Sequence, residues 1–327
     1  MNSHFKLTHE TIIINGHILH RIQALKDIPY HNVFKGDKGG FVESLHNLVD
    51  NAWVFDNAKV YQQAVLSGDS CIRDTAQAYG NAKVKDYAQL RNNAHIFDSA
   101  CISGRAVAKD NAQLYGRSHV YSNATIEGKS EILDNAQLHG KATASDAAKI
   151  SNNADVSGAS HIYDQAHIYG NAHIGGNVKA GGSAHIYEDA TACDNALIDG
   201  SSRVLGKSQL RGNCHITGNS TLSGQSKAYG HCTIKDYARI YQQSVVYGHA
   251  CVQQEALCYG NSHIYDNALI QGKSQVCDTA KAYQDCIIQG NSMVCENVHV
   301  AGRATCHGGI ISGNFTIGDN SHIYGQW

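Results

Sequence analysis

The sequence predicts an all-β fold, namely a single-stranded parallel β-helix whose triangular coils each consist of three six-residue sides. From Ala52 to Ala304 the chain repeats every six residues without an insertion or a deletion. In each six-residue repeat a small residue is followed two positions later by Val, Ile or Leu, with few exceptions. A short period maintained over this length is typical of a solenoid, in which each repeat buries its apolar face by stacking on its neighbours.

The aliphatic position of each repeat is predicted to point inward and to form the core. Of the 43 such positions from 54 to 306, nine are not Val, Ile or Leu, and these nine are seven Ala and two Cys. Pairs such as Gly80-Asn81 and Asp110-Asn111 are predicted to form the bends, because these residue types tolerate positive φ at the lowest steric cost. Three sides per coil then give about 14 coils.

Both ends of the repeat array have features of their own. The run Thr11–Ile14, the pair Asn15-Gly16 and the run His17–Ile22 predict a β-hairpin with a two-residue turn. We therefore expect an N-terminal β-hairpin cap over residues 1–47 and the β-helix over residues 48–327. The repeat slips by one residue near positions 306–311.

Composition excludes several classes of function. The net charge of −2 is not the basic balance of a protein that binds duplex nucleic acid. No apolar run approaches the ~18 residues of a membrane span, and the N-terminus lacks the apolar core of a signal peptide, so we expect a cytoplasmic protein with no membrane partner.

The eleven cysteines form no Cys-x-x-Cys pair, and their odd number does not indicate a disulfide framework. Cys277 and Cys295 are separated by three repeats, which is one full coil, and are expected to be neighbours in adjacent coils. The cysteines are interpreted as free cytosolic thiols, and we expect neither a metal nor a cofactor.

These six-residue repeats resemble the hexapeptide-repeat superfamily, the trimeric LpxA-like acyltransferases, over about 85% of the chain. The stretches 21–27, 36–44 and 51–54 are similar to a subgroup of YdcK-type acyltransferases found among bacterial and prophage proteins. The resemblance implies a left-handed β-helix, a homotrimer, and an acyl-CoA site in the groove between two subunits. Enzymes of the superfamily typically interrupt the coil with a loop at the catalytic histidine, whereas the array from 52 to 304 is uninterrupted.

Residues one coil apart are expected to stack on one face, so outward side chains form ladders. The position after the core aliphatic holds thirteen of the seventeen tyrosines. These ladders have two interpretations, which are aromatic stacking that stabilises the sheet and the core of a contact surface. The candidate interface tyrosines are Tyr229, Tyr247, Tyr265 and Tyr283 on one face, and Tyr61, Tyr79 and Tyr115 on another.

One row of polar residues is a candidate for chemistry. His167 and His185 are expected to be neighbours, with Arg203 next in the row and Lys149 before it. Either histidine is a candidate general base, and Arg203 and Lys149 are candidate ligands for phosphate. The alternative is that histidine is simply a tolerated polar residue on a β-surface.

Two functional hypotheses follow. The first is a non-enzymatic binding or scaffold protein that acts through its outward Tyr and His ladders, as a homo-oligomer with a trimer favoured. Its further partner would be a protein, such as a host factor that a prophage-derived protein interferes with, or a small anionic ligand that it sequesters. The second is an acyl-CoA-dependent acyltransferase in which an outward histidine at an inter-subunit groove is the general base, with acyl-CoA as co-substrate.

Overall fold

The structure, a computed structural model, describes residues 4–324 and is a parallel β-helix, as predicted. The chain divides into two compact units, residues 1–164 and residues 165–327. Within the described residues the helical segments are two 3-10 turns, η1 (Pro29–His31) and η2 (Leu45–Asn47). None of the described residues forms a helix with the length and apolarity needed to cross a membrane.

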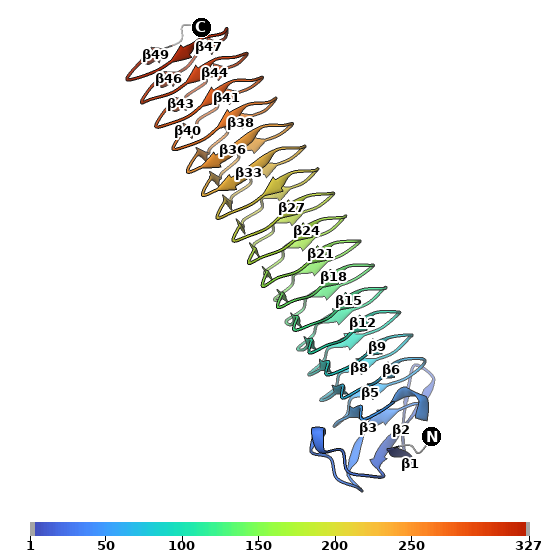
Figure 1. Cartoon of the computed structure of the whole chain (residues 1–327). Coiled ribbons are helices and arrows are strands. Elements are labelled where there is room, and N and C mark those ends of the chain that lie inside the picture. Colours follow the sequence, from blue (N-terminus) through green and yellow to red (C-terminus); the bar gives the residue numbers. More distant parts are fainter. Residues whose placement is uncertain (1–3, 325–327) are drawn as a thin grey trace. The chain divides into compact units, whose positions relative to one another are not determined.

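The first unit begins with the predicted hairpin, which lies at the blue end of the chain in Figure 1. Strands β1 (Phe5–Ile14) and β2 (His17–Ala24) pair antiparallel, and Asn15 and Gly16 form the turn with φ of 49° and 84°. Strand β3 (Lys38–Val42) pairs antiparallel with β2 and parallel with β5 (Lys59–Val60). Strand β3 is therefore the first strand of the β-helix, although it lies inside the range 1–47 predicted for the cap. It belongs to both the cap and the β-helix.

The remaining strands follow the six-residue repeat. In the first unit they run from β4 (Trp53–Val54) to β22 (His161–Ile162), each two residues long and each starting one repeat after the last. In the second unit the same spacing runs from β23 (His167–Ile168) to β46, and four of these strands are longer, namely β33 (Lys227–Gly230), β36 (Val245–Gly248), β43 (Ile287–Gln289) and β46 (Thr305–His307). The last strands are β47 (Ile310–Ile311), β48 (Thr316–Ile317) and β49 (His322–Tyr324).

Every third strand pairs in parallel, so three repeats make one turn of the helix, as expected. One column of strands has seven members in the first unit, β4 to β22, and nine in the second, β25 (Lys179–Ala180) to β49. Over residues 4–324 this gives sixteen turns, against the 14 expected. The difference arises because the count of repeats stops at 306, whereas strands continue through β49, and because the outermost turns are partial.

The inward positions confirm the predicted core. Each aliphatic, Ala or Cys residue at these positions from Val54 to Cys306 is 0% exposed. The small residue two positions earlier is also buried throughout the array, and this allows the backbone to close around the axis. The core is therefore one side chain thick per strand, and each repeat depends on the repeats above and below it in its own unit.

The bends explain the preference for Asp, Asn and Gly. Asp134 adopts φ of 59°, and its Oδ2 accepts the backbone N–H of Asn152 in the next coil at 2.9 Å. Where glycine occupies the bend, the coils lie too close for a side chain. A Cβ on Gly116, which has φ of 71°, would lie 2.7 Å from the backbone nitrogen of Asp134. The bend residue thus either caps the next coil or leaves space for it.

The register slip appears as a pairing shortened by one residue. Gln275 pairs with Met293, which lies one full coil length later in the chain. Met293 in turn pairs with Ile310, which lies one residue less than a coil length later. Val300 and Ile317 show the same shortened spacing. The inward pattern continues, because Ile311 and Ile317 are 7% and 6% exposed.

A charge at an inward position should unfold several coils. Ile216 is fully buried among the apolar inward residues, so I216D would bury an unpaired carboxylate. We expect the free energy of unfolding to fall by at least about 4 kcal/mol. Substitution of its outward neighbour in the same strand, H215D, should change it by less than about 1 kcal/mol. Equal denaturation midpoints for the two variants would show that the inward assignment is wrong.

Candidate functional site

The longest tyrosine ladder lies in the second unit. The rings of Tyr229, Tyr247, Tyr265 and Tyr283 are stacked with centroids 4.8–5.0 Å apart and planes 3–12° from parallel. The spacing follows from the step between parallel strands, since each ring extends from the same position of successive coils. Because the ring faces cover one another, the edges and hydroxyl groups form the exposed surface of the ladder.

Tyr229, Tyr247 and Tyr265 of the ladder are uncharged at neutral pH. Burial raises the pKa of Tyr229, and burial together with the neighbouring phenols of Tyr247 and Tyr283 raises the pKa of Tyr265 to about 12. Tyr229 is 40% exposed and the other three rings are half-buried. The surface is thus a straight row of neutral hydroxyl groups on an apolar base, which is the composition expected of an interface core.

The tyrosines of the first unit form a second ladder that is partly covered. Tyr61, Tyr79, Phe97 and Tyr115 stack with centroid distances of 4.9–5.1 Å. Tyr61, however, is only 2% exposed, because Leu19 and Phe41 of the cap pack against it. The Tyr115 hydroxyl donates to Glu131 at 3.1 Å. Of the predicted interface residues in this unit, Tyr79 and Tyr115 are half-buried, whereas Tyr61 serves the contact between cap and coil.

The predicted histidine row lies on one face of the second unit. His167 pairs with His185 and His185 pairs with Arg203, in the order that the coil length predicts. The rings of His167 and His185 are 5.9 Å apart and tilted by 58°, and the rings of His185 and Tyr169 are 5.9 Å apart and nearly perpendicular. Lys149 belongs to the first unit, where its Nζ lies 3.1 Å from a carboxylate oxygen of Glu131.

The same row continues to a second arginine that sequence reasoning did not single out. Arg203 pairs with Thr221, and Thr221 pairs with Arg239, so the two arginines stand two coils apart on either side of a small side chain. Two coils correspond to about 10 Å. The spacing of two coil lengths between the arginines, with Thr221 midway, is visible in the sequence, and the structure adds the hollow beside Thr221.

The short side chains of Thr221 and Ser223 leave a hollow of about 460 Å³ in this face. Arg203 and Arg239 line it, and Tyr187 and Tyr237 lie at its edges. Both guanidinium groups are exposed, and each presents a planar set of N–H donors that matches phosphate or carboxylate oxygens. The hollow therefore has the charge and the donors to hold a small anion, and His185 lies one coil from Arg203 in the same row.

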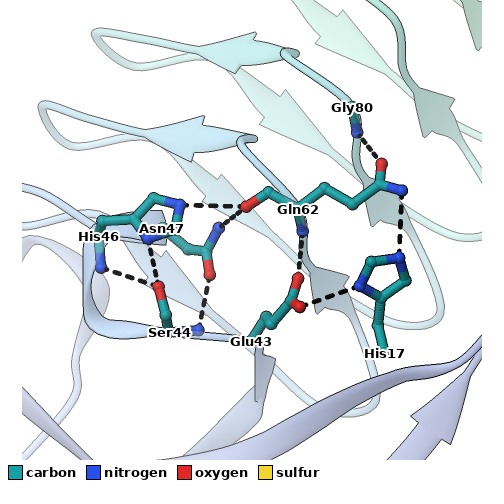
Figure 2. Close-up of polar contacts among 7 residues, drawn as sticks. All are labelled: His17, Glu43, Ser44, His46, Asn47, Gln62 and Gly80. Carbon is teal, nitrogen blue, oxygen red and sulfur yellow. Dashed lines mark hydrogen bonds and ion pairs between the residues drawn. The ribbon is translucent and has the colours of Figure 1, made fainter.

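A third polar cluster joins the cap to the first coils (Figure 2). His17 Nδ1 lies 2.9 Å from Glu43 Oε1, and the other oxygen of Glu43 accepts the backbone N–H of Gln62 at 2.5 Å. The side-chain nitrogen of Gln62 lies 3.3 Å from His17 Nε2, and its oxygen accepts the N–H of Gly80 at 2.7 Å. Both ring nitrogens of His17 therefore have partners within the chain. This arrangement suits a residue that anchors the cap, whereas a general base needs a ring nitrogen that faces its substrate.

The neighbouring side of this cluster caps the turn η2. The Ser44 hydroxyl accepts the backbone N–H of His46 and contacts His46 Nδ1, while Ser44 N–H donates to Asn47 Oδ1 at 2.8 Å. His46 Nε2 and Asn47 Nδ2 both bond to the carbonyl oxygen of Gln62. Glu43 and Ser44 belong to the stretch 36–44 that carries the family resemblance, and the structure gives that stretch a role in holding the cap.

Comparison with known proteins adds no family. No model of a known protein family matches the chain, and a search of curated proteins gives no significant match.

The cap should loosen in acid through Glu43. Burial alone raises the pKa of Glu43, but the hydrogen bonds from His17 and from the N–H of Gln62 outweigh it, and the pKa lies below its ordinary value. A lowered folded-state pKa stabilises the fold above the unfolded-state value of about 4.3, and this contribution is lost as the pH falls through the folded-state pKa.

Hydrogen exchange of the β2 amides, corrected for intrinsic rates, measures this effect. We expect the wild-type opening free energy to fall between about pH 5 and pH 3, and E43Q to be less stable at pH 6 and to lack that part of the pH dependence. E255Q, at an exposed pair with Lys273 in the second unit, is the matched control. An unchanged pH profile in E43Q would exclude Glu43 as the acid-sensitive anchor.

Proposed function

We propose that this chain is a non-catalytic binding protein that assembles with copies of itself through the ladder Tyr229, Tyr247, Tyr265 and Tyr283. The stacked geometry of these four rings is the observation that supports the proposal. A row with a constant pitch of 4.8–5.0 Å is matched over its whole length only by a surface with the same pitch, and a second copy of the chain has one. The hexapeptide-repeat resemblance, with its left-handed coils and homotrimers, favours a trimer.

The charges of the residues beside the ladder predict how assembly depends on salt. Lys227, Val245, His263, Lys281 and His299 form the adjacent row on the same face. Burial and the charge of Lys281 lower the pKa of both histidines, so the lysines carry the charge of this row at neutral pH. Two copies meeting here would bring lysines together, and salt would screen this repulsion. Eleven free thiols favour the cytoplasm as the location.

A second candidate function rests on the hollow between Arg203 and Arg239. Its two arginines suit the phosphates of acyl-CoA or another small anion, and His185 in the same row would be the general base of an acyltransferase. A binding protein that sequesters an anionic ligand requires only the arginines. The two versions differ in whether bound acyl-CoA is consumed.

Removal of ladder hydroxyls and rings should weaken assembly. In the double variant Y247S/Y265S we expect the dissociation constant of the oligomer to rise at least about tenfold, because the centre of the proposed interface is lost. Y237S is the control, since Tyr237 is 60% exposed and lies outside the ladder. Sedimentation equilibrium at low and high salt measures both proteins, and assembly should strengthen with salt. A wild-type chain that stays monomeric at micromolar concentrations would contradict the proposal.

Anion binding should depend on both arginines of the hollow. We expect R203Q and R239Q each to weaken the binding of pyrophosphate and of coenzyme A by about tenfold or more, because each removes one set of charge-assisted hydrogen bonds. R211Q, an exposed arginine that does not line the hollow, is the control. Calorimetry measures affinity, and a thiol-release assay with acetyl-CoA tests turnover. Equal affinities in all four proteins would exclude this site.

A further inference from the structure

Two cysteines and an aspartate come together on the same face as the arginine hollow, further along the second unit. Cys277 follows β41 (Gln275–Val276) and Cys295 follows β44 (Met293–Val294), which is the next strand in that column. Asp278 occupies the bend directly after Cys277. The two sulfur atoms and a carboxylate oxygen all lie within 4.8 Å of one another. The lack of a Cys-x-x-Cys pair predicts no metal site, and the coil brings these ligands together from adjacent turns instead.

The bend geometry holds Asp278 in place for this role. Its φ is 56°, and its Oδ2 accepts the backbone N–H of Glu296 at 2.9 Å, which orients the carboxylate between the two coils. Cys277 is 3% exposed, Cys295 is half-buried and Asp278 is exposed. Asp278 also lines a hollow of about 370 Å³ at the bend, so the carboxylate is open to solvent on that side.

The surroundings favour a cation over two thiolates. The two sulfur atoms and the carboxylate oxygen lie close enough together for their charges to repel one another when the thiols are deprotonated. The repulsion among these three charges is removed when one divalent ion takes the place of the two thiol protons. The Tyr259 hydroxyl, in the coil before Cys277, donates to Gln275 Oε1 at 3.1 Å, and the thiol of Cys277 lies 3.7 Å from the carbonyl oxygen of Val294.

We propose that Cys277, Cys295 and Asp278 bind one Zn²⁺ ion. Thiolate sulfur with a carboxylate oxygen is a donor set that suits Zn²⁺, and three protein ligands leave a fourth tetrahedral position open. Zinc–sulfur bonds of about 2.3 Å place the two sulfur atoms about 3.8 Å apart, within reach of small side-chain rotations from the present geometry. On binding, each thiol loses its proton to solvent and each sulfur donates a lone pair to the ion. The ion then cross-links two adjacent coils, because Cys277 and Asp278 lie in one coil and Cys295 in the next.

Cobalt and zinc binding to the full-length reduced protein test this proposal. Because twenty histidines offer other metal sites, the diagnostic signal is the thiolate-to-Co²⁺ charge-transfer absorption, which imidazole does not produce. We expect one equivalent of Co²⁺ to produce it, one equivalent of Zn²⁺ to remove it, and about two protons to be released per ion. Zinc should also raise the unfolding temperature.

Three variants and a control identify the ligands. We expect C277S and C295S to abolish the charge-transfer signal and D278N to weaken zinc binding about tenfold or more. D278N should keep the fold, because Asn92 occupies an equivalent bend and its Oδ1 accepts the N–H of Asp110. C251S, at a half-buried outward thiol in another column, should bind as the wild type does. No charge-transfer signal, or the same signal in C277S/C295S, or a Cys277–Cys295 disulfide that forms unhindered in the presence of Zn²⁺, would overturn the assignment.

Discussion

The stacking of parallel strands at a constant register of one coil is the constraint on which each unit depends. Within each unit, backbone hydrogen bonds such as Leu197 N–H to the carbonyl oxygen of Cys214 at 2.9 Å join the described coils to their neighbours. A strand displaced by one residue would turn its inward side chain to the opposite face, so the core restricts changes of length to the bends. The chain accommodates one such change, between Cys306 and Ile310, where the coils approach the end of the array.

This register determines the local chemistry of the surface. A side chain has two neighbours of fixed position, one in the coil before it and one in the coil after it, and their types decide whether a face is a ladder, a hollow or a cluster. Four tyrosines in sequence form a ladder, one threonine between two arginines forms a hollow, and two cysteines beside a bend aspartate form a candidate metal site. Each site thus arises from a small set of substitutions in an otherwise uniform repeat.

At the N-terminal edge the repeat gives way to a hairpin that covers the first coil. An uncovered coil would expose unpaired strand groups, and β2 and β3 cover them while Glu43, His17 and Gln62 connect the hairpin to the coils. This cluster contains residues usually found in catalysis, yet their hydrogen-bonding groups are directed at one another. A histidine beside a glutamate is therefore not by itself a catalytic site, and the partners of both ring nitrogens decide its role.

The sequence alone determined the fold class, the inward residues, the hairpin and the ladders, because a strict six-residue period leaves one way to bury the aliphatic side chains. It also placed His167, His185 and Arg203 in one row. Only the tertiary structure decided that Tyr61 is covered by the cap, that Thr221 opens a hollow beside Arg239, and that Asp278 meets Cys277 and Cys295. The physical reason is that a repeat fixes which positions are adjacent, whereas side-chain size and the direction of a bend decide which atoms meet.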